Sequence, residues 1–124
     1  MNFGENIGIE QVFAEKGSVK LKLPITDKVR QPFGFLHGGV SVALAEQAAS
    51  IGAIQLVAED EIAFGLEINA NHIKSIREGT IYAIAEILHA GQTTQVWQVK
   101  IESENSDLIA ICRVTMAVKK KRAK

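Results

Sequence analysis

Alternating apolar and polar side chains predict two β-strands in the last third of the chain. Within residues 95–103, Trp97, Val99 and Ile101 fall on one face and polar residues separate them. After the polar stretch 104–107, the same alternation runs from Leu108 to Met116. Successive side chains of a strand point to opposite faces. Each of these strands is therefore expected to bury one face and leave the other partly solvated.

Earlier segments follow related patterns. Residues 62–74 and 80–88 also have the composition of strands. Residues 7–26 predict a hairpin around Lys16-Gly17-Ser18, and its second arm places apolar side chains on one face: Val19, Leu21, Leu23 and Ile25. Residues 27–36 contain Pro32 and Gly34 and are expected to form a structured loop.

The segment 38–58 differs from the strands because strong helix formers dominate it and it carries almost no charge. It predicts a helix that is apolar on all sides and therefore largely buried. Glu46 is its only ionisable residue before the C-terminal end. A carboxylate in a buried helix is costly unless something compensates it, which makes Glu46 the least expected residue in the sequence.

Two strands, one long helix and four further strands predict an α+β fold in which an antiparallel sheet wraps around a single helix. The length of 124 residues suits one core. We therefore expect a single domain over residues 1–124, with residues 119–124 as a basic tail. That tail is expected to be solvated rather than to bind lipid or nucleic acid.

Charge and cysteine content narrow the function further. Fourteen acidic residues balance fourteen basic ones, and the body lacks the basic excess of nucleic-acid-binding domains. The single cysteine, Cys112, cannot form an internal disulfide and is expected to be a small buried side chain. No leader-like or membrane-spanning pattern is present. These features predict a soluble cytoplasmic protein with neither a nucleic-acid nor a membrane partner.

Candidate chemistry gathers where the loop meets the helix. Gly38 and Gly39 stand where the first unpaired helical N–H groups are expected, and such a helix start stabilises developing negative charge. Glu46 and Ser50 are four residues apart on one helical face, so the hydroxyl can hold the carboxylate or a water molecule. His37, by contrast, stands just before the helix and is separated from Glu46 by about eight helical rises, or about 12 Å along the axis. If these residues cooperate, Glu46 must face Gln31, His37 and Gly38 of a second chain in a two-fold dimer.

The stretch from Gln31 to Ser50, which includes His37-Gly38-Gly39 with Glu46 nine residues after the histidine, resembles the hotdog-fold acyl-CoA thioesterases. Together with residues 65–72, it is most similar to the branch of 4-hydroxybenzoyl-CoA and 1,4-dihydroxy-2-naphthoyl-CoA thioesterases. The resemblance extends over residues 24–118. It implies the hotdog fold, hydrolysis of an aromatic acyl-CoA, and a homodimer with shared active sites that pairs again into a tetramer.

The resemblance also implies roles for individual residues. Glu46 would be nucleophile or general base, the Gly38 N–H would polarise the thioester carbonyl, and Ser50 would position Glu46 or the attacking water. Gln31 and His37 would orient the thioester and the acyl ring. The CoA arm would lie along two segments, and its contacts would be His72, Lys74, Ser75, Arg77, His89 and Gly91. Among these, Lys74 and Arg77 would meet its phosphates. Relatives usually carry a basic residue after that glycine, where this chain has Gln92 and Thr93.

No metal is required by these roles, and no cofactor is expected because CoA is part of the substrate. The depth of the acyl pocket would depend on side chains that include Phe33, Phe35, Ile51 and Phe64. Two other interpretations are weaker: a non-catalytic acyl-CoA sensor, which would not need Glu46, and an acyl-thioester dehydratase, whose acid and histidine spacing is absent. A purely structural dimerisation module would need neither the acid nor the glycine pair.

Overall fold

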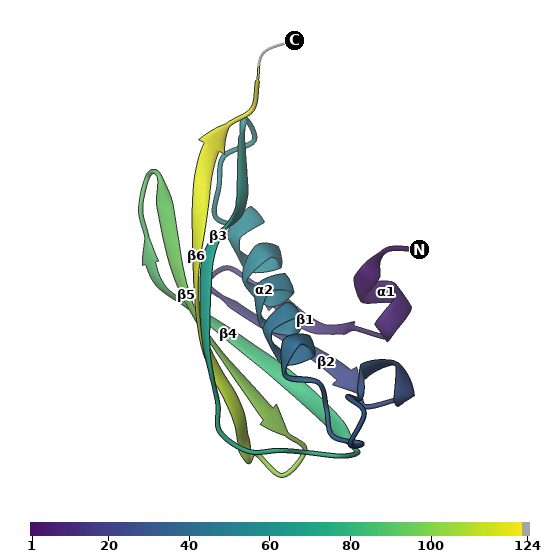
Figure 1. Cartoon of the computed structure of the whole chain (residues 1–124). Coiled ribbons are helices and arrows are strands. Elements are labelled where there is room, and N and C mark those ends of the chain that lie inside the picture. The colour runs from purple at the N-terminus through teal and green to yellow at the C-terminus, as the bar shows by residue number, and fades with distance from the viewer. Residues whose placement is uncertain (123–124) are drawn as a thin grey trace.

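The computed structural model describes residues 1–122. Six strands and one long helix account for most of them (Figure 1). In chain order the elements are α1 (Phe3–Ile7), β1 (Glu10–Glu15), β2 (Ser18–Pro24), the 3-10 turn η1 (Asp27–Val29), α2 (Gly38–Ile54), β3 (Glu61–His72), β4 (Thr80–Ala90), β5 (Thr94–Ser103) and β6 (Leu108–Lys120).

The strands form one antiparallel sheet in the order β1-β2-β4-β5-β6-β3. The sheet curves around α2, which crosses one of its faces (Figure 1). This arrangement confirms the α+β fold and the single wrapped helix. It also makes β3 an edge strand, because β3 pairs with β6 alone within the described chain.

The core lies between α2 and the sheet face that α2 covers. The second arm of the hairpin buries its predicted apolar set, with exposed fractions of 7% or less at Val19, Leu21, Leu23 and Ile25. Trp97, Val99 and Ile101 are fully buried, as the alternation predicts. From α2, small residues such as Ala45 and Ala49 face the sheet. Their size lets the helix lie close against the strands.

The strand ends differ from the predictions by one or two residues, and two other boundaries differ more. The expected strand from residue 7 is preceded by the short helix α1, which begins with the side-chain cap of Asn2 on the Glu5 N–H and ends at Gly8 in the left-handed conformation. The long helix ends at Ile54 rather than at residue 58. There the buried Gln95 side chain donates from Nε2 to the Ala53 carbonyl, which satisfies one of the last helical acceptors.

The helix α2 is not buried on all sides, contrary to the prediction. A stripe of residues at helical spacing stays partly or fully exposed, and it consists of Gly39, Ala43, Glu46, Ser50 and Ile54. Beside this stripe, α2 contacts α1, where Gly4 packs on the Gln47 amide. The periodicity gave little sign of this stripe because, apart from Glu46 and Ser50, its residues are as apolar as those that face the sheet.

The predicted basic tail begins inside β6, which includes Lys119 and Lys120. Lys121 and Arg122 follow and are exposed, while residues 123–124 lie outside the described part of the chain. Within residues 1–122, no helix has the length and apolarity needed to cross a lipid bilayer.

Candidate active site

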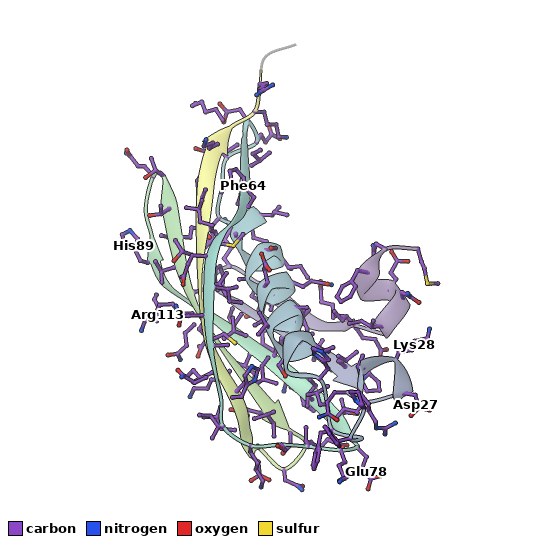
Figure 2. All side chains as sticks on the ribbon, viewed as in Figure 1. Asp27, Lys28, Phe64, Glu78, His89 and Arg113 are labelled. Carbon is purple, nitrogen blue, oxygen red and sulfur yellow. The ribbon has the colours of Figure 1, made fainter. Side chains whose placement is uncertain are left out.

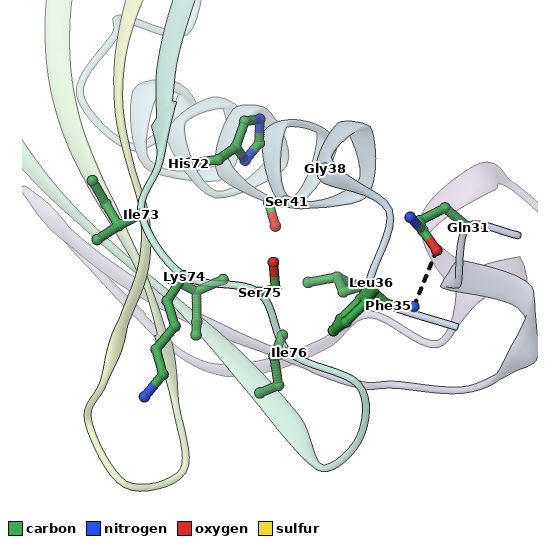
Figure 3. A pocket seen from close by; sticks show the side chains of 11 residues that line it. Gln31, Phe35, Leu36, Gly38, Ser41, His72, Ile73, Lys74, Ser75 and Ile76 are labelled. Atoms are coloured by element: carbon green, nitrogen blue, oxygen red, sulfur yellow. Dashed lines mark hydrogen bonds between the residues drawn. The ribbon is translucent and has the colours of Figure 1, made fainter. Parts of the chain in front are cut away.

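The Gln31 side chain is held by the backbone of its own loop. Its Oε1 accepts hydrogen bonds from the N–H groups of Phe33 at 2.7 Å and of Phe35 at 3.1 Å. Two backbone donors on one amide oxygen determine which end of the amide carries the nitrogen. Nε2 is therefore left to donate elsewhere, and Figure 3 shows it on the side that faces the start of α2.

The start of α2 presents an unused N–H group. His37 is the N-cap residue, and its Nδ1 accepts a hydrogen bond from the Gly39 N–H at 2.9 Å. Nδ1 must be unprotonated to accept, so a neutral His37 carries its proton on Nε2. The Gly38 N–H takes part in none of the hydrogen bonds found among residues 1–122. It lies at the positive end of the helix dipole and is available to a ligand oxygen.

A cavity of about 280 Å³ opens beside this helix start (Figure 3). Five predicted site residues line it: Gln31, Gly38, His72, Lys74 and Ser75. The His72 ring packs so closely on Gly38 that a Cβ added there would lie 3.0 Å from the ring. The structure thus brings together the end of the loop, the start of α2 and the end of β3.

Glu46 lies outside this cavity. Its carboxylate is directed at Gly65 of β3, where an added Cβ would lie 2.5 Å from Oε2. Glu46 is exposed, and none of the hydrogen bonds or ion pairs found among residues 1–122 uses its carboxylate. The expectation of a buried acid is therefore wrong for a single chain. Ser50 is half-buried beside it and forms no hydrogen bond with it in the described structure.

The two basic residues expected along the CoA arm have partners within the chain. Lys74 Nζ pairs with Asp107 at 3.0 Å, and both side chains are about half exposed. The Arg77 guanidinium stacks on the Phe35 ring at 4.1 Å from its centroid. Arg77 Nη1 also donates to the Phe33 carbonyl at 3.4 Å. Neither group is a free cation at the edge of the cavity.

His89 lies near the end of β4 and Gly91 lies in the turn that leads to β5, and both are away from the first cavity. The His89 ring covers Gly91, where an added Cβ would lie 2.7 Å from Nε2. A second cavity of about 540 Å³ is lined by Gly91, Gln92 and Thr93 together with Leu56 and Val57, which follow α2, and Lys120 of β6. The predicted site residues of one chain are thus distributed over three places.

Large apolar side chains stay unburied near the exposed stripe of α2. Ile54 is 63% exposed at the end of α2, and Phe64 and Leu66 are 40% and 58% exposed on β3. Phe33 is 80% exposed on the Gln31 loop, whereas Phe35 and Ile51 are half-buried. Where exposed side chains of this size form a contiguous patch, they mark a surface that a ligand or another chain covers.

Sequence reasoning missed two residues of the site. Ser41 is 1% exposed, lines the first cavity and points its hydroxyl toward Ser75 (Figure 3). Gly65 gives Glu46 the room it occupies, and the ladder is irregular directly after it. A glycine within a strand pattern signals a bulge or a close approach, so Gly65 could have been found.

The ionisable groups with shifted pKa values lie outside the first cavity. A hydrogen bond from Lys120 lowers the pKa of Asp60 below its ordinary value, and the same contact raises the pKa of Lys120. Burial raises the pKa of the Cys112 thiol to about 11. Among residues 1–122, no group of three or more His, Cys, Asp or Glu side chains is placed to hold a metal ion.

Comparisons with known proteins agree on one family. Residues 33–110 match the model of the thioesterase superfamily. The 1,4-dihydroxy-2-naphthoyl-CoA hydrolase of Listeria monocytogenes is 57% identical, over 98% of this chain and 99% of that protein. The enzyme of the same name from Escherichia coli is 40% identical, over 82% of this chain and 74% of that protein.

A solved structure agrees as well. A thioesterase from Staphylococcus aureus superposes with a TM-score of 0.93 at 43% identity, covering 96% of this chain and 99% of that one. Two of its structures carry a single Glu-to-Ala and a single Gln-to-Ala change, at positions fifteen residues apart. Gln31 and Glu46 have the same separation in this chain.

Proposed function

The chain belongs to the thioesterase superfamily, and from this premise we propose that it hydrolyses aromatic acyl-CoA thioesters at a site built by two copies of the chain. The first substrate to test is 1,4-dihydroxy-2-naphthoyl-CoA, because the Listeria relative is named for it. Exposed apolar side chains on α2, β3 and the Gln31 loop supply a surface that suits a flat aromatic acyl group. The proposed location is the cytoplasm.

The proposal of a two-chain site rests on one observation. Within a single chain, the acid Glu46 lies far from the donors that would polarise the thioester carbonyl. Gly38 and Glu46 are eight residues apart on α2, which corresponds to about 12 Å along the axis. Only the Gly38 end lines the cavity with Gln31, whereas Glu46 lies on the exposed stripe of α2. A thioester carbon that is held by one end is out of reach of the carboxylate at the other.

A two-fold partner would remove this separation. The free edge of β3 offers unpaired backbone groups, and exposed apolar side chains lie along it at Ile62, Phe64 and Leu66. Pairing of β3 with a second β3 would set the two α2 helices antiparallel, so that Glu46 of each approaches Gly38 of the other. In that interface Glu46 would be buried, as the sequence predicts, although it is exposed in a single chain. The dimer-of-dimers tetramer is a further part of the proposal.

The chemistry then follows from the free groups. The thioester carbonyl oxygen accepts hydrogen bonds from the Gly38 N–H and from Gln31 Nε2, which stabilise the negative charge that develops on it. Glu46 attacks the carbonyl carbon and the C–S bond breaks, giving an anhydride that water hydrolyses, or Glu46 removes a proton from a water molecule that attacks the carbon and displaces the thiolate. In both routes the thiolate takes up a proton that comes from the water. Both routes release CoA as a thiol and the acyl group as a free acid. Both need an ionised Glu46 next to the thioester.

Release of free thiol from a panel of thioesters tests the proposal. The panel contains 1,4-dihydroxy-2-naphthoyl-CoA, benzoyl-CoA and short- and long-chain acyl-CoA. We expect the wild type to be fastest on an aromatic thioester and Glu46→Ala to lose about 10³-fold or more in kcat. Glu86→Gln is the control, because it removes an exposed carboxylate on β4 outside both cavities. Tight thioester binding without hydrolysis by the wild type would instead favour the sensor.

A further inference from the structure

We propose that Arg77 is a positioning residue for Gln31, holding the loop whose backbone orients the Gln31 amide, and that its main task is not to bind the phosphates of CoA. This inference rests on the proposed function, in which Gln31 Nε2 donates to the thioester carbonyl. Arg77 is then expected to affect the rate of the reaction rather than the affinity for the nucleotide.

The loop that carries Gln31 is closed by its own hydrogen bonds. The Gln31 N–H donates to the Phe35 carbonyl at 2.8 Å, and the Gly34 N–H donates to the Gln31 carbonyl at 2.9 Å. Gly34 has a φ of 93°, a conformation that residues with a Cβ rarely adopt. The N–H groups of Phe33 and Phe35 converge on Gln31 Oε1 within this loop. Any shift of Phe33 or Phe35 therefore redirects Nε2.

Arg77 contacts the same two phenylalanines. Its guanidinium stacks on the Phe35 ring at 4.1 Å, and its Nη1 donates to the Phe33 carbonyl at 3.4 Å. A Cβ added at Gly34, between them, would lie 2.9 Å from Nη1, so the guanidinium lies directly over the loop. The two residues that fix the Gln31 amide are thus the two that Arg77 contacts.

The backbone beside Arg77 is tied to both ends of the loop. Arg30 Nε donates to the Arg77 carbonyl at 2.9 Å, just before Gln31. The Leu36 N–H donates to the Ile76 carbonyl at 2.8 Å, just after Phe35. Arg77 therefore extends from a segment that is already fixed against the loop. Because its backbone is fixed, the Arg77 side chain can hold Phe33 and Phe35 in place.

The chemistry of the contact requires arginine rather than any cation. A planar guanidinium stacks on an aromatic ring and donates sideways at the same time, whereas a lysine ammonium is a compact charge on a flexible stem. A residue that only neutralised phosphate would tolerate lysine, since the charge is the same. The variant Arg77→Lys therefore distinguishes positioning of the loop, which it should impair, from phosphate binding, which it should preserve.

A double-mutant cycle tests the inference, with kcat and KM measured for the wild type, Arg77→Lys, Gln31→Ala and the double variant. We expect Arg77→Lys to lower kcat about tenfold with KM changed less than about twofold, because a small misplacement of a polarising group slows the chemical step. In the Gln31→Ala background, Arg77→Lys should cost less than about twofold more. Arg113→Lys, on the other face of the sheet (Figure 2), is the matched control.

Other outcomes would show whether the positioning role of Arg77 or the proposed use of Gln31 is wrong. A raised KM for Arg77→Met that Arg77→Lys restores would show a phosphate contact and overturn the positioning role. Equal loss of kcat from Arg77→Lys with and without Gln31 would overturn it too, since the two residues would then act independently. An unchanged kcat in Gln31→Ala would instead refute the use of Gln31 in the proposed function, and the positioning role with it.

Discussion

At the scale of single residues, the hydrogen bonds already made determine which groups remain for a ligand. His37 uses the Gly39 N–H and leaves that of Gly38, while the loop uses Gln31 Oε1 and leaves Nε2. Both remaining groups are donors, and donors fixed in advance stabilise an oxyanion without reorganisation during the reaction. In the proposed mechanism, the local backbone thus prepares the half of the site that would polarise the thioester carbonyl.

Cys112 offers a residue-scale prediction of pH dependence. Its side chain is buried and its thiol has a pKa of about 11, above the ordinary value of 9.0. Between pH 9 and 11 the thiol of the unfolded chain ionises while that of the folded chain does not. The free energy of unfolding should therefore fall over this range, by at most about 3 kcal/mol. Urea unfolding at a series of pH values, with Cys112→Ala as the reference, measures it.

The same thiol should resist modification. In the native protein at pH 8 we expect Cys112 to react with a disulfide reagent far more slowly than in urea, because both burial and the raised pKa suppress the thiolate. Equal rates in the two conditions, or an identical pH dependence of unfolding in Cys112→Ala, would contradict the buried neutral thiol.

Glu46 could be identified from the sequence, but its surroundings could not. A lone acid in an apolar helix is a compositional signal that needs no coordinates. Glu46 is exposed in one chain because it lies on the side of α2 that the sheet does not cover. The small apolar residues on that side look the same in the sequence as those that face the core. The orientation of the Gln31 amide could not be predicted either. It depends on the φ of Gly34 and on the N–H groups of Phe33 and Phe35, two and four residues away.

At the scale of elements, the end of α2 depends on one strand. Gln95 of β5 is 2% exposed, donates to the Ala53 carbonyl at 3.3 Å and accepts from the Trp97 indole N–H at 2.8 Å. Gly52 packs directly on the same indole. A single amide thus satisfies a helix terminus and a buried indole donor together, which fixes α2 against the sheet.

Replacing Gln95 should loosen this attachment. We expect Gln95→Leu to lower the free energy of unfolding by about 2–4 kcal/mol, because the indole N–H and the Ala53 carbonyl are left buried and unpaired. Gln98→Leu, on the other face of β5, should change it by about 0.5 kcal/mol or less. Urea unfolding followed by Trp97 fluorescence compares the variants. A similar small change in both would show that the Gln95 contacts add little.

Periodicity predicted the longer elements well and the short ones poorly. The strands of the core were found because a period of two over several residues is a strong signal. The helix α1 was missed because five residues hold little periodicity. Its ends nevertheless carry local signals, namely Asn2 as a cap, Glu5 three residues later and Gly8 after the last turn. Capping chemistry would have found a helix that hydrophobic pattern could not.

At the scale of the whole molecule, the described sheet ends in two edge strands, β1 and β3, of which β3 is the longer. An edge strand of twelve residues with apolar side chains along it would be prone to uncontrolled pairing if nothing covered it. The exposed stripe of α2 lies on the same side of the molecule, since Glu46 faces Gly65 of β3. One self-complementary interface would cover both, and it would complete two equivalent sites at once.

Complementation between two inactive variants tests this arrangement directly. Glu46→Ala and Gln31→Ala are co-produced with different tags, and the mixed dimer is isolated through both tags. One of its two sites takes Glu46 from one chain and Gln31 from the other and is intact, while the second site lacks both. We therefore expect the mixed dimer to recover about half of the wild-type kcat. Each parent alone should stay at its own low level.

The control pairs Glu46→Ala with the double variant Gln31→Ala, Glu46→Ala, a combination in which no chain supplies the acid. This pair should recover nothing, because neither site can contain Glu46. If the first mixed dimer is no more active than the average of its parents, Glu46 and Gln31 act within one chain, and the loop or α2 must then move to bring them together. Recovery in the first pair and none in the second would place the catalytic acid and the polarising amide on opposite sides of the dimer interface.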